Sequence, residues 1–167
     1  MPPIFADSRV IRLVMVVGVA FALAACSSKN GLNGADLSIT GGAAKPGSAQ
    51  EFVVSVGDRV FFLTDSANFT PQATATLNRQ VQWLRQYPQY TFVIEGHADE
   101  RGTREYNIAL GARRATATRD YLIARGVSAN RMRTISYGKE RPVAVCNDIS
   151  CWSQNRRAVI VLNNAGV

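Results

Sequence analysis

The stretch 92–114, FVIEGHADERGTREYNIALGARR, decides the fold of this 167-residue chain. Residues 92–96 alternate with the period of two that is typical of a half-buried strand. Residues 97–102, HADERG, then place four ionisable side chains within six positions. Thr103 is in position to cap a helix, and Glu105 falls in its first turn, where the helix dipole favours a negative charge. The stretch therefore predicts a strand, a polar turn and the start of a long helix.

This charged turn has two interpretations. It is compatible with a solvated loop, because connecting segments are polar by default. It is also compatible with a recognition site, because so many charges stand at one strand-to-helix junction. Composition alone leaves both open.

The N-terminal residues predict export and lipidation. Two arginines precede an apolar run, 13–22, which is too short for the ~20 residues that span a bilayer. The run ends in LAAC (23–26), and small residues directly before a cysteine resemble the lipobox cleaved by lipoprotein signal peptidase. We expect residues 1–25 to be a lipoprotein signal peptide, with an ordinary secretory signal as the alternative. Cys26 would carry an N-acyl chain and an S-diacylglycerol group, and no other cofactor is expected.

Net charge limits the possible partners. Removing residues 1–25 deletes Asp7, Arg9 and Arg12, so the formal charge falls from +7 to +6. A basic protein suits nucleic acid, anionic lipid or an acidic polymer. Export makes nucleic acid implausible, so no nucleic-acid partner is expected.

Residues 26–50 predict a lipidated N-terminus followed by a flexible tether. The segment is rich in Ser, Gly, Ala, Asn and Lys and has almost no large apolar residue. Such a composition cannot bury enough surface to offset its ordering entropy. As a random coil it would span ~25–30 Å.

Residues 51–167 predict one globular domain. Residues 52–56 and 59–63 read as two strands around a Gly57-Asp58 turn. Thr70-Pro71 starts a helix that ends before Pro88. A second helix is expected over 104–124, closed by Gly126. The expected inner faces are Ala73, Leu77, Val81 and Leu84 for the first helix, and Ile108, Ala112, Ala115 and Leu122 for the second.

Two further strands complete the predicted architecture. Residues 132–137 alternate, and residues 157–162 end in the apolar run AVIVL, typical of a strand that is central or covered on both faces. The order of elements indicates an α/β (α+β) two-layer sandwich, βαβαβ-β, with a mixed sheet and helices on one face.

Several spaced motifs carry a resemblance to a known family. The region 60–162 resembles the OmpA-like peptidoglycan-binding domain and, more narrowly, the lipoproteins of the Tol–Pal system. The motifs are GHADERGT (96–103), YN (106–107), LG (110–111), RRA (113–115), YGKE (137–140) and NRRAV (155–159). The resemblance implies the same sandwich fold and a lipoprotein of the outer membrane that faces the periplasm. It also implies non-covalent binding of the diaminopimelate-containing stem peptide of peptidoglycan, which tethers the membrane to the wall during division. TolB and other Tol proteins would be partners, and Ser27 after the lipidated cysteine favours the outer membrane.

The same resemblance assigns a binding site. The family uses an Asp in the strand-to-helix loop and an Arg fifteen residues later, here Asp99 and Arg114. Diaminopimelate ends in an amino and a carboxyl group on one carbon, which a carboxylate and a guanidinium suit. The resemblance adds backbone groups near Asp65, Ala67 and Leu110, and a structural role for Asn107. The alternative is that Asp99 and Arg114 only pair with each other to order the loop.

Gly111 stands where many members of the family have Ser. A glycine within a helix costs ~1 kcal/mol relative to Ala. A close approach by a ligand or by a neighbouring element would explain it.

An enzyme or a metal site has little support. His97 is the only histidine and has no nucleophile beside it in the sequence. His97, Asp99 and Glu100 are adjacent loop residues without a distant third ligand, so no metal site is expected. Nothing places Asp65 and Asp99 at the spacing of a glycosidase pair. We therefore expect a binding protein that is not an enzyme.

Cys146 and Cys151 predict a disulfide. An exported chain folds in an oxidising compartment, and these two cysteines remain once Cys26 is lipidated. The family pattern does not include this pair, so the expectation depends on the chemistry. The short loop makes the disulfide a local clamp.

Overall fold

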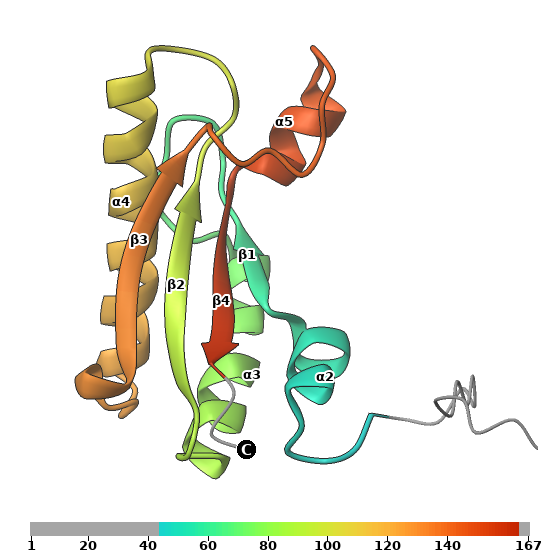
Figure 1. The fold of residues 1–167 in the computed structure, drawn as a ribbon, viewed down its shortest axis with the longest axis vertical. Coiled ribbons are helices and arrows are strands. Elements are labelled where there is room, and N and C mark those ends of the chain that lie inside the picture. The colour runs from blue at the N-terminus through green and yellow to red at the C-terminus, as the bar shows by residue number, and fades with distance from the viewer. Residues whose placement is uncertain (1–43, 164–167) are drawn as a thin grey trace, which may run out of the picture. The chain divides into compact units, whose positions relative to one another are not determined.

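Four strands form one mixed sheet in the order β1–β4–β2–β3 (Figure 1). The strands are β1 (Arg59–Phe61), β2 (Thr91–His97), β3 (Met132–Gly138) and β4 (Arg157–Asn163). β2 and β3 run parallel, and β4 is antiparallel to both of its neighbours. The computed structural model describes residues 44–163, and none of the helices in that range is long and apolar enough to cross a membrane. The central position predicted for the AVIVL strand is confirmed.

Two long helices cover one face of the sheet, as predicted (Figure 1). They are α3 (Pro71–Gln86) and α4 (Arg104–Ile123). Both predicted caps form: the Thr70 hydroxyl accepts from the Ala73 N–H at 3.1 Å, and the Thr103 hydroxyl accepts from the Tyr106 N–H at 3.2 Å. Each cap satisfies one of the backbone donors that a helix start leaves without a partner.

The core lies between these helices and the sheet. Phe92 and Ile94 of β2 point into it, as the period of two predicted. All four residues predicted for the inner face of α3 are buried: Ala73, Leu77, Val81 and Leu84. Burial of such side chains is worth ~1.5–3 kcal/mol each.

The inner face of α4 differs from the prediction at one position. Ala112 is exposed, and the small residues against the sheet are Gly111 and Ala115. A Cβ atom on Gly111 would lie 2.4 Å from the Ser136 hydroxyl, and one on Gly96 would lie 1.8 Å from the Gly111 carbonyl oxygen. Close packing of the helix backbone on β2 and β3 therefore explains why Gly111 is a glycine.

The strand predicted at 52–56 is wrong. The chain there continues a short helix, α2 (Ala49–Glu51), as a π-helical segment, η1 (Phe52–Gly57). Phe52 is completely buried, with its ring 4.9 Å from that of Trp83, and Val56, four residues later, packs against the same core. A spacing of four places both side chains on one side of a helix, whereas a strand would need a partner.

The ordered domain also begins before residue 51. The Gly47 carbonyl accepts a hydrogen bond from the Tyr90 hydroxyl at 2.7 Å, and the Gly47 N–H donates to Glu51. Residues 44–50, which were expected to belong to the tether, thus lie against the domain. The predicted signal peptide, Cys26 and the remainder of the tether lie outside the described residues.

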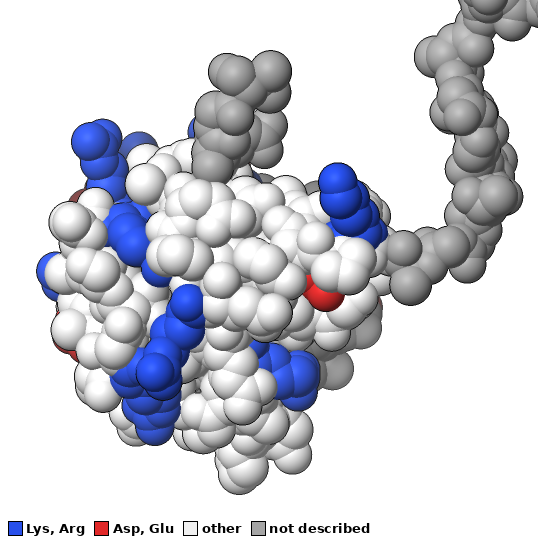
Figure 2. Space-filling model, turned by 90° about the horizontal axis from the view of Figure 1, so that it is seen from below, with Lys and Arg blue, Asp and Glu red and all other residues white. Residues whose placement is uncertain are grey.

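The two ends of the sheet differ in character. β2 and β3 begin at the lower end of Figure 1, where a short 3₁₀ helix, η2 (Ala129–Arg131), precedes β3. Figure 2 looks onto this lower end and shows several Lys and Arg side chains and little acidic surface. The charged turn of 97–102 follows β2 at the opposite end.

Candidate functional site

The charged turn and the loop after β1 enclose a cavity of about 310 Å³. Four of the predicted site residues line it: Asp65, Asp99, Asn107 and Leu110. Its remaining lining residues, which sequence reasoning did not assign to the site, are Thr64, Arg101, Gly102 and Tyr106. Ala67 is half-buried and is not part of the lining. Positions 65 and 99 are far apart in the sequence, but they lie close together in the structure because β1 and β2 both end at this end of the sheet.

Asp99 is a buried carboxylate held between two arginines. Its Oδ2 lies 2.7 Å from Arg101 Nη2 and 3.2 Å from Arg156 Nη1, and its Oδ1 accepts from Arg101 Nε at 3.1 Å. Burial raises the pKa of Asp99, but the hydrogen bonds from Arg101 and Arg156 outweigh it, so the pKa lies below its usual value. The site therefore presents an ionised carboxylate at neutral pH.

Arg114 of α4 is 0% exposed and is not part of the lining of the cavity beside Asp99. Its guanidinium donates to three backbone carbonyls, those of Ser66 at 2.8 Å, His97 at 2.7 Å and Leu63 at 3.1 Å. These bonds use three of the five N–H groups of a guanidinium. Burial and repulsion from Arg156 lower the pKa of Arg114 to about 10, so it remains charged at neutral pH.

Asp99 and Arg114 do not form an ion pair with each other within residues 44–163. The alternative interpretation of a simple loop-ordering pair is therefore wrong for these two residues. Arg101 and Arg156 supply the cations of Asp99, and the attraction between Arg114 and Asp99 acts without direct contact. The sequence offered one indication of this arrangement, since Arg101 stands two positions after Asp99.

Asp65 faces the cavity from the opposite wall. It is the non-glycine residue with a positive φ, 54°, in the described part of the chain. Its carboxylate accepts a hydrogen bond from the Tyr106 hydroxyl of α4. The left-handed conformation costs free energy and is typical of turns that hold a side chain in place at a functional site.

The turn itself is fixed from both sides. The Asn107 amide donates to the Arg101 carbonyl at 2.8 Å, which is a structural contact of the kind that the resemblance implied. Lys139, at the end of β3, donates to the carbonyls of Gly102 at 2.7 Å and Glu100 at 3.1 Å. The carboxylate and cations of the turn are thus held in place before any ligand arrives.

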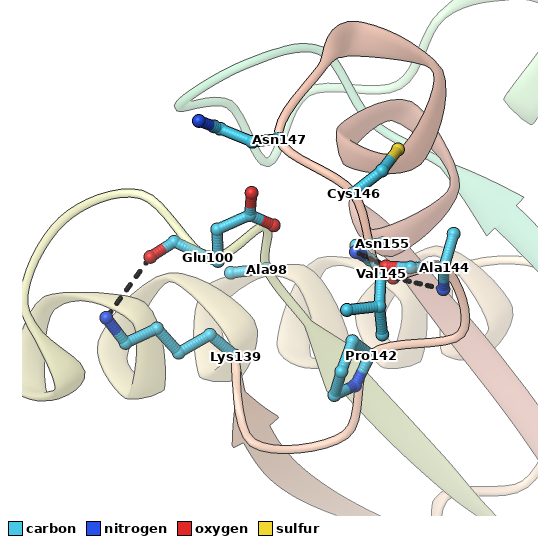
Figure 3. Close-up of a pocket in the computed structure, with 9 residues that line it drawn as sticks. All are labelled: Ala98, Glu100, Lys139, Pro142, Ala144, Val145, Cys146, Asn147 and Asn155. Carbon is cyan, nitrogen blue, oxygen red and sulfur yellow. Dashed lines mark hydrogen bonds between the residues drawn. The ribbon is translucent and has the colours of Figure 1, made fainter.

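A second cavity of about 360 Å³ lies on the other side of the turn (Figure 3). Its lining runs from Ala98 and Glu100 to the loop that follows β3 and is mainly apolar. Asn155 closes this loop by accepting from the N–H groups of Val143 at 2.8 Å and Ala144 at 3.2 Å. This cavity is larger than the one beside Asp99, but it lacks the paired arginines and the buried carboxylate. We therefore place the binding site beside Asp99.

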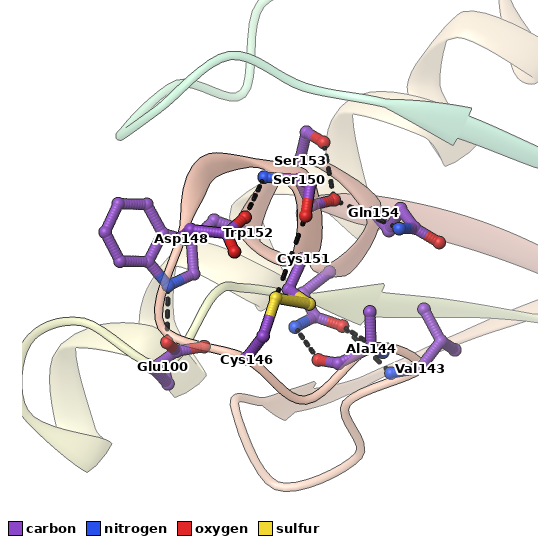
Figure 4. Close-up of a disulfide and its surroundings, with 11 residues drawn as sticks. Glu100, Val143, Ala144, Cys146, Asp148, Ser150, Cys151, Trp152, Ser153 and Gln154 are labelled. Carbon is purple, nitrogen blue, oxygen red and sulfur yellow. Dashed lines mark hydrogen bonds between the residues drawn. A yellow bond between two sulfur atoms is a disulfide. The ribbon is translucent and has the colours of Figure 1, made fainter.

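A short helix that was not predicted supports the rim of the site. It is α5 (Ile149–Asn155), capped by the Asp148 carboxylate, which accepts from the Ser150 N–H at 2.7 Å (Figure 4). The predicted disulfide between Cys146 and Cys151 is confirmed, with 5.7 Å between the Cα atoms. Trp152 of α5 donates its indole N–H to Glu100, and the Arg101 guanidinium lies 4.1 Å above the indole ring. The clamped helix thus holds both residues that follow Asp99.

His97 is buried below the turn, 2% exposed, and its ring nitrogens make no hydrogen bond within residues 44–163. Burial, followed by repulsion from Arg157, Arg141 and Arg59, lowers the pKa of His97 to about 4. Glu95 Oε2 lies 3.5 Å from His97 Nε2 and favours the charged form, but burial and the three arginines outweigh it. The imidazole is therefore neutral at physiological pH.

This burial predicts a loss of stability in acid. The unfolded chain takes up a proton near pH 6.5, whereas folded His97 does so only near pH 4. Stability should fall by roughly 3 kcal/mol over that interval on account of this residue, at ~1.4 kcal/mol per pH unit. Urea unfolding at pH 7 and pH 4 measures it. His97→Phe should remove this contribution to the pH dependence of stability. If the free energy of unfolding falls equally in the wild type and in the variant, His97 is not the group responsible.

The described residues show no metal-binding cluster beside the groups already named. Among residues 44–163, no three His, Cys, Asp or Glu side chains gather in a way that could hold a metal ion. Asp99 and Asp65 are both engaged, the first with arginines and the second with Tyr106. The arrangement suits a small zwitterionic group, since it offers an ionised carboxylate beside cationic groups in a recess.

Comparisons with known proteins agree with this description. Residues 61–156 match the model of the OmpA family. The chain is 66% identical over 158 residues to a peptidoglycan-associated lipoprotein of Rhizobium meliloti, covering 93% of this chain and 88% of that one. It is 64% identical over 156 residues to one of Mesorhizobium japonicum, covering 92% and 93%. The crystal structure of the peptidoglycan-associated lipoprotein from Burkholderia pseudomallei matches with a TM-score of 0.63 and 42% identity, covering 66% of this chain and 96% of that one.

The fold and the family model define an OmpA-family domain. The chain belongs to that family and, within it, to the peptidoglycan-associated lipoproteins.

Proposed function

We propose that this chain is an outer-membrane lipoprotein that binds the diaminopimelate-containing stem peptide of peptidoglycan without cleaving it. The observation that carries the proposal is the ionised, buried Asp99 at the wall of a cavity, with the charged guanidinium of Arg114 buried nearby. The names of the relatives, which associate them with peptidoglycan, support it. Binding of this kind would tether the outer membrane to the cell wall.

The chemistry of the ligand matches the two charges. Asp99 would accept the ammonium group at the end of the diaminopimelate side chain, and Arg114 would bind the adjacent carboxylate. Because Arg114 is completely buried, a ligand can reach its two remaining N–H groups only if the segment 63–67 shifts. Leu63 and Asp65 are exposed, so a shift of this segment would break the hydrogen bond from Tyr106 to Asp65 but would not remove either side chain from the core.

A pull-down with isolated sacculi tests the proposal. The full-length protein should sediment with sacculi, and free meso-diaminopimelate should release it. Release of soluble muropeptides should stay at the level of a protein-free control. Binding that diaminopimelate fails to displace would refute the assignment of the ligand, and muropeptide release would refute the assignment as a binding protein.

Attachment to the outer membrane at Cys26 is part of the same proposal. The lipobox before Cys26 and the membership in a lipoprotein family support it. We expect Cys26→Ser to lose labelling by a fatty acid fed to the cells, because Cys26 is the lipobox residue that would carry the acyl chains. A variant that is still labelled would rule the attachment out.

Partnership with TolB and other Tol proteins is proposed from the family. Arg101, Arg104, Tyr106 and Arg113 are exposed around the cavity and could take part. If TolB uses this surface, purified TolB should compete with sacculi for the protein. Simultaneous binding of both partners would contradict a shared surface.

A further inference from the structure

A third cavity lies at the end of the sheet opposite to Asp99. It measures about 450 Å³ and is formed where β2 and β3 begin and β4 ends. Its polar lining comes from Arg131, Arg133, Asn130, Asn163 and Thr91, with no acidic side chain among the described lining residues. β2 is seven residues long, so at ~3.3 Å per residue about 20 Å separate this cavity from the charged turn.

Arg131 provides a fixed positive charge in this cavity. Its guanidinium donates to the carbonyls of Leu84 at 2.9 Å, Tyr87 at 3.1 Å and Tyr90 at 2.8 Å. These bonds cap the end of α3 and hold the side chain still, but a carbonyl does not neutralise a charge. Neither Arg131 nor Arg133 forms an ion pair with a carboxylate in the part of the chain that the structure describes.

Arg133 provides a second positive charge, which is not paired with a carboxylate of the described residues. Its backbone is part of β3, but its side chain is exposed. A fixed guanidinium beside a free one, with two amide side chains, matches the oxygen atoms of a phosphate group. The chemistry of the cavity thus selects an anion, and phosphate suits it best.

The place where the described chain begins indicates the source of that phosphate. Gly47 accepts a hydrogen bond from Tyr90, whose own carbonyl accepts from Arg131, so the first described residues of the chain lie at this end of the domain. Exposed Lys45, Arg85 and Arg125 belong to the same end, and Figure 2 shows how basic it is. A bilayer that carries the lipid anchor would lie within reach of this end of the domain.

We propose that the end of the domain around Arg131 and Arg133 binds phosphate headgroups of the bilayer in which the lipoprotein is anchored. The Asp99 cavity then points away from the bilayer toward the wall. The proposal uses the proposed lipid attachment at Cys26, and it is independent of which group the Asp99 cavity binds. Exposed cations add to such binding in a way that salt screens.

Vesicle sedimentation of the isolated domain, residues 44–167, tests this proposal. Residues 44–163 belong to one compact unit, and the Burkholderia chain, 96% of which is matched, corresponds to only 66% of this chain. The domain should bind vesicles containing phosphatidylglycerol more tightly than vesicles of phosphatidylcholine alone, with a difference that shrinks as salt is added. Arg133→Glu should weaken this binding by roughly tenfold, since it replaces an attraction by a repulsion.

Arg141→Glu is the matched control, because it changes the net charge equally on an exposed side chain that follows β3 at the opposite end of the domain. It should bind vesicles as the wild type does. Equal losses in the two variants would reduce the effect to net charge and overturn the proposal. Absence of vesicle binding would also overturn the proposal. If inorganic phosphate still shifts the NMR signal of Arg133 while vesicles do not bind, the cavity binds only a small anion.

Discussion

Asp99→Ala should reduce binding to isolated sacculi by well over tenfold. Within the described residues, Asp99 is the one carboxylate of the cavity wall that forms ion pairs with two arginines. We expect this carboxylate to bind the ammonium group of the ligand. Losing one partner of a shielded charge pair costs ~2–5 kcal/mol, mostly through the charge left without a partner. The pull-down described above measures the loss directly.

Two further variants separate charge from shape at this position. Asp99→Asn keeps the size of the side chain but removes the charge, so it should bind almost as poorly as Asp99→Ala. Asp120→Ala removes an exposed carboxylate of α4 that pairs only with Arg119, and it should bind normally. If Asp99→Ala sediments with sacculi as the wild type does, the ligand is bound elsewhere.

Asp99→Ala should also lower the melting temperature, because Arg156 is buried and loses its carboxylate. Asp99→Asn retains an acceptor for Arg156 and should melt at a higher temperature than Asp99→Ala. Binding is therefore compared at a temperature at which circular dichroism shows all variants folded.

The sequence predicted most of the fold because its strongest patterns are local. Residues 92–96 alternate, Thr70 and Thr103 cap helices, and these features depend on neighbours in the chain. The error at 52–56 has a different origin. The residues are β-branched and aromatic, but Phe52 is buried against Trp83 of α3, a tertiary contact that overrides strand propensity.

The error at Ala112 and the missed helix α5 follow the same logic. A helix face chosen by apolar residues favoured Ala112, whereas the helix turns Gly111 and Ala115 to the sheet, where a side chain at position 111 would collide with Ser136. α5 is only seven residues long, which is too short to show a periodic apolar pattern. It is stabilised instead by a disulfide and by the contacts of Trp152, which the local sequence pattern does not reveal.

The structure brings together some of the predicted site residues, but their pairing could not be predicted. Asp65, Asp99, Asn107 and Leu110 line one cavity, whereas Ala67 and Arg114 are not part of its lining. The contact of Asp99 with Arg156 joins residues 57 positions apart, and such a contact has no local signature. The three carbonyls that hold Arg114 belong to the loop after β1 and to the last residue of β2, and these contacts have no local signature in the sequence either.

Arg114→Ala should cost the domain much of its stability as well as its binding. Three backbone carbonyls would lose their donor, that of His97 in a buried position and those of Leu63 and Ser66 in partly buried positions, and the missing side chain would leave a cavity. Buried groups that lose their partners in this way cost ~1–3 kcal/mol each, so we expect a loss of about 3–5 kcal/mol in total. Urea unfolding at pH 7 measures this loss, and a change of less than 1 kcal/mol, about the value of a surface contact, would contradict the structural role.

Arg114→Lys distinguishes that structural role from a role in binding. Lysine keeps the charge, but its single ammonium cannot span the carbonyls of Leu63, Ser66 and His97 and also meet a ligand carboxylate. The variant should be less stable than the wild type and should bind sacculi at least tenfold more weakly at a temperature where it is folded. Arg125→Lys makes the same exchange on an exposed side chain at the opposite end of α4 and should change neither property. Full sacculus binding by folded Arg114→Lys would show that Arg114 only supports the loop and that the ligand's carboxylate is bound by another cation, with Arg101 at the cavity wall the first to examine.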